Sequence, residues 1–179
     1  TFTIQDTTDP IISVQAADLT VQCDGNGNIS DLNNWLAANG GASASDVCSS
    51  VTWSNDFSAV SDDCGATGTV TVTFTATDDC GNDTTTSATF TIQDTTDPII
   101  SVQAQDVTVQ CDGNGNISDL NNWLASNGGA SASDVCSSVT WTNDFSAVSD
   151  GCGASGSVTV TFTATDDCGN DTTTSATFT

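Results

Sequence analysis

Apolar residues alternate with threonine along one stretch of the chain, Thr69 to Thr77, where Val70, Val72, Phe74 and Ala76 occupy every second position. This alternation predicts a β-strand with one buried face and one threonine-rich, solvated face. A second alternating run, Thr84 to Ile92, follows a polar turn at Asp78–Asp83. The two runs therefore predict an antiparallel hairpin.

Shorter apolar runs earlier in the chain predict three further strand segments, Ile11–Val14, Leu19–Cys23 and Val51–Trp53. Polar stretches separate them, and we interpret Asp24–Asn28 as a turn and Ala42–Asp46 as a loop. Six or seven strand signals in 88 residues, closed by a hairpin, predict an all-β fold of the Ig-like β-sandwich type.

One segment has helical periodicity instead. Leu32, Trp35 and Leu36 follow i, i+3, i+4 spacing, which predicts a short helix over Asp31–Asn39 inserted in the sandwich. Ser30 is a suitable N-cap, and Gly40-Gly41 ends the segment. We expect Trp35 to belong to the core.

The whole pattern repeats with a period of 88 residues, because Thr1–Ile12 recurs unchanged as Thr89–Ile100. We therefore expect residues 1–9 to be the terminal strand and linker of a preceding module, 10–97 repeat 1, and 98–179 repeat 2. The chain starts and stops inside the same strand pattern, which indicates an excerpt of a longer tandem array. Residues 1–91 and 89–179 differ only at Ala17/Gln105, Leu19/Val107, Ala38/Ser126, Ser54/Thr142, Asp63/Gly151, Thr67/Ser155 and Thr69/Ser157.

The charge of the chain excludes several classes of partner. The 179 residues include no Lys, Arg or His, and 23 acids give a formal net charge of −23. Nucleic-acid binding depends on basic side chains that contact phosphates, so we expect no nucleic-acid partner. No apolar run is long enough to span a bilayer, and we expect no direct membrane insertion.

Enzymatic function is also disfavoured. Without His, Lys or Tyr, the chain offers no Ser–His–Asp or Cys–His constellation. Paired aspartates can serve glycoside hydrolysis, but near-perfect duplication of a cleft-bearing module is an unusual way to build an enzyme. We therefore expect a protein that is not an enzyme.

Eight cysteines occur as two identically spaced sets of four. This usage is typical of disulfides in an oxidising, extracellular compartment. A metal cluster is the competing interpretation, although neither a C-x-x-C pair nor a histidine accompanies the cysteines.

Two motifs carry a resemblance to a known family. They are Asp-Thr-Thr-x-Pro at Asp6–Pro10 and Val-Thr-Phe-Thr-Ala-Thr-Asp-x-Cys-Gly-Asn ending at Asn82, with copies at Asp94–Pro98 and Phe162–Asn170. The 88-residue unit resembles the HYR-like (hyalin repeat) Ig-type modules of giant Bacteroidetes surface adhesins, including gliding-motility adhesins. The resemblance implies tandem Ig-like modules, a role in cell adhesion, and an extracellular location at the cell surface.

Sandwich topology suggests how the cysteines pair, although four cysteines allow three pairings. The hairpin turn and the start of the Val51 strand should lie at one pole, and the end of the first strand at the other. We therefore predict the disulfides Cys23–Cys64, Cys48–Cys80, Cys111–Cys152 and Cys136–Cys168.

Acidic residues gather at the pole that holds the linker and the hairpin turn. Such hard oxygen ligands suit Ca²⁺, which accepts six to eight of them. The alternative is that these aspartates and asparagines only form turns. The candidate ligands are Asp6, Asp9, Asp46, Asp78, Asp79, Asn82 and Asp83 in repeat 1, and Asp94, Asp97, Asp134, Asp166, Asp167, Asn170 and Asp171 in repeat 2.

A second candidate metal site is the stretch Asp24-Gly-Asn-Gly-Asn-Ile-Ser-Asp31, whose alternating oxygen ligands are similar to the start of an EF-hand loop. It lacks the glycine at the sixth position, and a turn followed by a helix cap explains it equally well. The candidate ligands are Asp24, Asn26, Asn28 and Asp31, with the copies Asp112, Asn114, Asn116 and Asp119.

These observations favour a structural function, a calcium-stiffened repeat that forms an extracellular stalk or filament of a surface adhesin. Its partners would be adjacent repeats of the same chain and laterally associated copies. The alternative is a module that binds a carbohydrate, a surface or ice through its Thr-rich strands. Asp-Thr-Thr also resembles the O-glycosylation signal of Bacteroidetes, which makes Thr7, Thr84, Thr95 and Thr172 candidate glycosylation sites.

Overall fold

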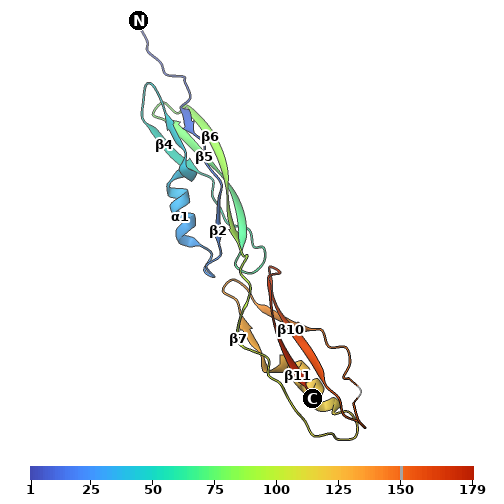
Figure 1. Cartoon of the computed structure of the whole chain (residues 1–179). Coiled ribbons are helices and arrows are strands. Elements are labelled where there is room, and N and C mark those ends of the chain that lie inside the picture. Colours follow the sequence, from blue (N-terminus) through green and yellow to red (C-terminus); the bar gives the residue numbers. More distant parts are fainter. Residues whose placement is uncertain (150) are drawn as a thin grey trace. The chain divides into compact units, whose positions relative to one another are not determined.

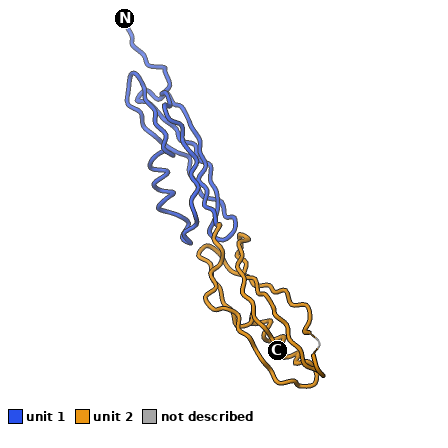
Figure 2. Tube along the Cα trace, viewed as in Figure 1, with its two compact units in different colours: residues 1–94 blue, residues 95–179 orange. Residues whose placement is uncertain are grey.

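The computed structural model describes residues 1–149 and 151–179, which form two compact units, Thr1–Asp94 and Thr95–Thr179 (Figure 2). Strands are the main regular structure of each unit, and the helices are short, so the predicted all-β fold class is confirmed. Within the described residues, no helix has the length and apolar character needed to cross a membrane.

The larger sheet of unit 1 has four strands in the order β2 (Leu19–Gln22), β6 (Asp83–Gln93), β5 (Gly68–Asp78) and β4 (Val51–Asn55) (Figure 1). The predicted hairpin is confirmed, because β5 and β6 pair antiparallel with Val70 opposite Phe90. Strand β2 pairs parallel to β6 along its full length. The alternation seen in the sequence therefore places Val72, Phe74 and Ala76 in the core, each with no exposed surface.

A second, two-stranded sheet pairs β1 (Ile11–Val14) antiparallel with β3 (Ser43–Ser45). The prediction of a loop over Ala42–Asp46 was wrong for these three residues. Small residues without a hydrophobic pattern give no strand signal of their own. They become a strand because β1, about 30 residues earlier in the chain, supplies the hydrogen-bonding partner.

The predicted helix exists as α1 (Ile29–Ala37), but it starts earlier than expected and Ser30 is not its cap. The N-cap is Asn28, which has a left-handed conformation with φ 48°. Asparagine tolerates this conformation better than most residues. Its amide also donates hydrogen bonds to the Gln22 carbonyl and the Asp31 carboxylate, both at 3.0 Å, which hold the turn in place.

The helix covers the core side of the larger sheet through Trp35, which is 6 % exposed. Its ring meets Phe74 edge-on, with centroids 5.3 Å apart, and lies 5.6 Å from the ring of Phe90. The indole N–H donates a hydrogen bond to the Ala17 carbonyl at 3.0 Å. The prediction that Trp35 belongs to the core is confirmed.

Unit 2 repeats this architecture, with Trp123 packed on Phe162 and Phe178. At the sheet edge that β2 occupies in unit 1, Val107 of unit 2 pairs parallel with Phe178. Its elements are β7 (Ile99–Val102), α2 (Ile117–Ala125), η2 (Asn127–Gly129), β8 (Ser131–Ser133), β9 (Val139–Asn143), β10 (Val158–Asp166) and β11 (Asp171–Phe178). In unit 1 the turn that corresponds to η2 is η1 (Asn39–Gly41).

Candidate metal site at the acidic pole of unit 1

The candidate site lies at one end of unit 1, where three segments that are distant in the sequence meet. Asp6 precedes β1, Asp46 follows β3, and Asp78 is the last residue of β5. We call these three aspartates, together with Asp79, Cys48 and Cys80, the acidic pole. In unit 1 the segment before β1, the loop after β3 and the hairpin turn meet at this pole.

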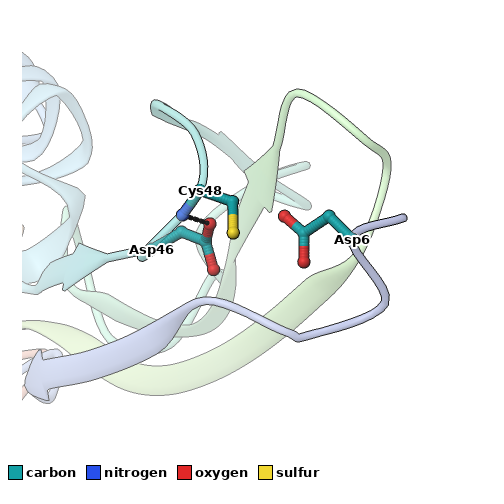
Figure 3. A group of neighbouring side chains, drawn as sticks. All are labelled: Asp6, Asp46 and Cys48. Atoms are coloured by element: carbon teal, nitrogen blue, oxygen red, sulfur yellow. Dashed lines mark hydrogen bonds between the residues drawn. The ribbon is translucent and has the colours of Figure 1, made fainter. Parts of the chain in front are cut away.

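Asp6, Asp46 and Cys48 form the closest group of the pole, each offering one ligand atom within 4.8 Å of the others (Figure 3). The Asp6 carboxylate faces the Cys48 sulfur and the Asp46 carboxylate in this view. Its Oδ1 accepts a hydrogen bond from the Thr8 amide at 3.1 Å. Its Oδ2 is buried and has no hydrogen-bond partner among the described residues.

A buried carboxylate oxygen without a partner is unfavourable, because it loses its hydration and gains nothing in return. Asp46 adds a second carboxylate whose hydrogen bonds all go to one oxygen. Its Oδ1 accepts the amides of Cys48 at 2.8 Å and Ser49 at 3.0 Å, and within the described chain no bond reaches Oδ2. Asp6 Oδ2 and Asp46 Oδ2 can therefore accept a cation.

The carboxylate of Asp78 is committed to its own turn. It accepts the Cys80 and Asn82 amides, both at 2.8 Å, and the Asn82 side-chain amide at 2.7 Å. Burial opposes its ionisation, but these hydrogen bonds together outweigh burial and lower the pKa of Asp78 below its ordinary value. Asp78 is thus explained as a turn residue.

The neighbouring Asp79 connects the hairpin turn to the start of β4. It accepts the Ser50 hydroxyl at 3.0 Å on each of its two oxygens. The closest group of ligand atoms also leaves out Asp9 and Asp83, which are exposed. Of the seven candidate ligands of repeat 1, the structure therefore brings together Asp6 and Asp46.

Four of the eight cysteines are disulfide-bonded, where the sequence predicted two disulfides in each repeat. The bonded residues are Cys23, Cys64, Cys136 and Cys168, and the thiols are Cys48, Cys80, Cys111 and Cys152. The two units differ at equivalent positions. Cys48 and Cys80 are thiols in unit 1, whereas their counterparts Cys136 and Cys168 are bonded in unit 2. Cys23 and Cys64 are bonded in unit 1, whereas their counterparts Cys111 and Cys152 are thiols in unit 2. Our predicted pairings therefore stay predictions.

The two thiols of unit 1 belong to the acidic pole, and their surroundings disfavour the thiolate. The charge of Asp6, then burial, then the charges of Asp46 and Asp78 raise the pKa of the Cys48 thiol. Burial first, followed by the charge of Asp78, raises the pKa of the Cys80 thiol. These surroundings therefore disfavour the thiolate, which is the reactive form of cysteine, at both positions.

In unit 2 the turn acids behave as they do in unit 1. Asp134 Oδ1 accepts the Cys136 amide at 2.7 Å. Hydrogen bonds from Asn170 and Cys168 outweigh burial and lower the pKa of Asp166. Asp167 accepts the Ser138 hydroxyl at 3.0 Å and 2.9 Å. Among the other candidates of repeat 2, Asp97 and Asp171 are exposed, and Asp94 Oδ1 accepts the Gln22 side-chain amide at 3.1 Å.

The EF-hand-like stretch of unit 1 is a turn closed on itself. Asp24 Oδ1 accepts the amides of Asn26 at 2.7 Å and Asn28 at 3.0 Å, and these hydrogen bonds lower the pKa of Asp24. Asn28 is 2 % exposed, and its amide group faces Gln22 and Asp31. The copy at Asp112–Asp119 has the same bonds. The hydrogen bonds of this stretch are therefore those of a turn that leads into α1.

Sequence reasoning missed a different use of aspartate, at the strands themselves. Asp18 Oδ1 accepts the Thr89 amide at 2.8 Å, and Asp56 Oδ1 accepts the Thr73 amide at 2.7 Å. Unit 2 repeats both contacts through Asp106 and Asp144. No local pattern predicts them, because the partners lie 17 and 71 residues apart.

The candidate glycosylation sites differ in accessibility. Thr7 and Thr95 are exposed, whereas Thr84 and Thr172 are half-buried and lie in β6 and β11.

No family model matches the chain, and no curated protein matches it. Similar solved structures include Drosophila N-cadherin EC1-4, with 9 % identity, a TM-score of 0.36, and coverage of 96 % of this chain and 49 % of that chain. The protocadherin GammaB4 extracellular domain has 11 % identity, a TM-score of 0.34 and coverage of 96 % and 32 %. Mouse clustered PcdhgC3 EC1-3 has 9 % identity, a TM-score of 0.29 and coverage of 95 % and 66 %. The chain thus spans between about a third and two thirds of these cadherin structures.

Proposed function

We propose that this chain is a structural tandem repeat that forms an extracellular stalk or filament of a surface adhesin, and that calcium binding at its acidic poles stiffens it. The observation that carries the calcium part is the buried Asp6 Oδ2, which has no hydrogen-bond partner in the described chain and lies beside the Asp46 carboxylate.

The residues of the pole fit a hard cation. Asp6 and Asp46 supply carboxylate oxygens, which Ca²⁺ prefers, whereas the sulfur of Cys48 suits softer metals. We assign Cys48 to the predicted disulfide with Cys80, which leaves the carboxylates to hold the ion. Bound calcium would supply the positive charge that a chain without basic side chains lacks.

The same site is expected in repeat 2 from sequence alone. Asp94 and Asp134 occupy the positions of Asp6 and Asp46 after 88 residues. An ion bound by Asp94 would restrain the segment that leads to Pro98, whose ring already limits the backbone. We therefore expect calcium to reduce bending between repeats.

Three features support a structural role over recognition or catalysis. Each unit has its own aromatic core, centred on Trp35 in one and Trp123 in the other. The two repeats are nearly identical in sequence, which suits a spacer better than a distinct recognition tip. The resemblance to HYR-like adhesin modules points the same way, and the residue composition gives no support to an enzyme.

The threonine faces have an explanation within the sheet. The hydroxyls of Thr71 and Thr89 bond each other across the hairpin at 3.0 Å, and Ser87 bonds Thr73 at 3.3 Å. These cross-strand pairs stabilise the β5–β6 hairpin without any external ligand.

The proposal is tested by titrating calcium into the two-repeat chain, with calorimetry and thermal melting as readouts. We expect saturable binding and a melting temperature that rises with calcium, because the unfolded chain cannot gather the ligands. The double variant Asp6→Asn, Asp94→Asn should lose both responses. Asp62→Asn, an exposed acid outside the pole, is the charge-matched control and should retain them.

Stiffness is measured separately by small-angle scattering with calcium and with chelator. We expect a longer maximum dimension with calcium in the parent chain and in Asp62→Asn, but not in the double variant. If chelator changes neither melting nor scattering, the acids are turn residues only and the proposal fails.

A further inference from the structure

Asparagine is followed by glycine at four places in the chain, in the pairs Asn26-Gly27, Asn39-Gly40, Asn114-Gly115 and Asn127-Gly128. Such a pair loses its side-chain amide spontaneously when the glycine nitrogen reaches the asparagine side chain, because no Cβ shields that nitrogen. In all four pairs the glycine has a positive φ angle, between 64° and 81°. The glycine conformation is thus similar throughout, and the surroundings decide which pair reacts.

The Asn39-Gly40 pair belongs to the turn η1, which packs against the core of unit 1. Gly40 is buried, and a Cβ added there would lie 3.0 Å from the Ala16 Cβ and 3.1 Å from the Phe74 ring. The Asn39 carbonyl accepts the Ala42 amide at 3.1 Å. The peptide link of this pair therefore cannot rotate without losing core contacts and a hydrogen bond.

The Asn26-Gly27 pair lies in the turn before α1 and lacks that packing. Asn26 is exposed, and a Cβ added to Gly27 would meet no atom within 4 Å. Asp24 Oδ1 accepts the amides of Asn26 at 2.7 Å and Asn28 at 3.0 Å, and neither amide belongs to the peptide link between Asn26 and Gly27. The carbonyl and the amide of that link form no hydrogen bond among the described residues. The link can therefore rotate while Asp24 holds the turn.

The side chain of Asn26 is also weakly held. Its amide donates a long hydrogen bond, 3.3 Å, to the Asp24 carbonyl. By contrast, the Asn28 side chain donates to the Gln22 carbonyl and the Asp31 carboxylate, both at 3.0 Å, and Asn28 is 2 % exposed. Rotation about the Cα–Cβ bond of Asn26 therefore brings its amide carbon towards the next backbone nitrogen at the loss of a weak contact.

We propose that Asn26 and its copy Asn114 are self-modification sites, at which the folded protein converts asparagine into aspartate and isoaspartate. Asn114 is exposed as well, and a Cβ added to Gly115 would meet no atom within 4 Å. The pairs that contain Gly40 and Gly128 keep their amides, because both glycines are buried. This reaction goes beyond the structural role proposed above and does not involve calcium.

The reaction needs water and no other reagent. The Gly27 nitrogen gives up its proton to the solvent and attacks Cγ of Asn26, which closes a succinimide ring. The bond from Cγ to the side-chain nitrogen breaks, and this nitrogen takes up a proton and leaves as ammonia. Water then opens the ring at one of its two carbonyl carbons. Attack at one carbon gives aspartate, and attack at the other gives isoaspartate.

The products change the turn. Each conversion adds one carboxylate to a chain whose formal net charge is already −23. Isoaspartate also adds one carbon to the main chain between Asp24 and Asn28, because the chain then runs through the former side chain. The hydrogen bond from the Asn28 amide to Asp24 should not survive this insertion. Since Asn28 is the N-cap of α1, we expect the modification to loosen the first turn of that helix.

The sites are tested by incubating the folded 179-residue chain in mildly alkaline buffer with chelator and mapping its peptides by mass spectrometry over time. We expect the amide to be lost at least tenfold faster from Asn26 and Asn114 than from Asn39 and Asn127. In urea that unfolds the chain, the four rates should become similar, because the core then no longer protects the two buried pairs.

Gly27→Ala is the matched variant, because its Cβ shields the nitrogen that attacks. It should slow the reaction at Asn26 at least tenfold and leave the reaction at Asn114 of the same molecule unchanged. An unchanged rate at Asn26 in this variant overturns the attack by Gly27. An Asn26 that reacts only in urea overturns the modification site, and equal rates at Asn26 and Asn39 in the folded chain overturn the role of burial. The chelator keeps all of these outcomes separate from the calcium proposal.

Discussion

Gly40 and Gly41 offer a direct test of how the core constrains the turn after α1. Both have positive φ angles, 64° and 82°, so an alanine at either position adopts a strained backbone. Only Gly40 faces the core. A Cβ there would lie 3.0 Å from the Ala16 Cβ and 3.1 Å from the Phe74 ring, whereas at Gly41 it would meet nothing within 4 Å.

The magnitudes follow from these two terms. A left-handed backbone costs a residue with a Cβ about 1–2 kcal/mol, and this is the whole expected cost of Gly41→Ala. Gly40→Ala adds overpacking against Phe74, which typically costs about 1–3 kcal/mol. We therefore expect Gly40→Ala to destabilise unit 1 by about 2–5 kcal/mol. The difference between the two variants isolates the packing contribution.

Urea unfolding followed by tryptophan fluorescence measures both variants. Unit 2 remains unchanged in each and serves as an internal reference, so Gly40→Ala should separate the curve into two transitions. Gly128→Ala and Gly129→Ala repeat the pair in unit 2, where the Gly128 Cβ would lie 3.0 Å from both Ala104 and the Phe162 ring. Equal costs for Gly40→Ala and Gly41→Ala would refute the packing argument.

Three further predictions concern acid, the core and the sheet edge. The lowered pKa values of Asp24 and Asp78 mean that their ionised forms favour the folded state. Their contribution to the free energy of unfolding is therefore complete above the unfolded-state pKa of about 4, and it is lost as the pH falls through their pKa values in the folded state. Acid titration followed by circular dichroism would detect this loss of stability. Trp35→Phe removes the indole hydrogen bond and leaves a small void, and should lower the free energy of unfolding by about 2 kcal/mol in urea melts. Asp56→Ala leaves the Thr73 amide of β5 without its partner and should lower the free energy of unfolding by about 1–2 kcal/mol. The control Asp62→Ala should lower it by less than about 0.5 kcal/mol. Equal losses in the two variants would contradict a stabilising role for the Asp56 hydrogen bond.

The long hairpin could be predicted from sequence because its signal is local. From Val70 to Ala76 each residue type matches the face it occupies. Ser43–Ser45 could not be predicted as a strand, since its partner β1 is distant and its residues are small and polar. The helix start was misplaced because Ser30 and Asn28 are both common caps. The hydrogen bond from the Asn28 side-chain amide to the Gln22 carbonyl, six residues earlier, favours Asn28.

The sequence predicted where the acidic residues gather, but not which of their oxygens remain available to a cation. Asp78 and Asp79 have the same residue type as Asp6, and only the structure shows that their oxygens already accept turn hydrogen bonds. Burial of Asp6 Oδ2 without a hydrogen-bond partner depends on the segments of Asp6 and Asp46, 40 residues apart, meeting at one end of the unit. Sequence periodicity cannot report this kind of meeting.

The parallel pairing of β2 with β6 has a mechanical consequence. Strand β2 lies near the start of unit 1, while β6 leads out of it towards Thr95, and the two run side by side from Leu19–Phe90 to Gln22–Gln93. A tension applied along the chain would pull the beginning of β2 and the end of β6 in opposite directions. The hydrogen bonds between them would then be loaded in shear together and would not open one after another. Unit 1 should therefore resist extension through this pair of strands, as the proposed stalk requires.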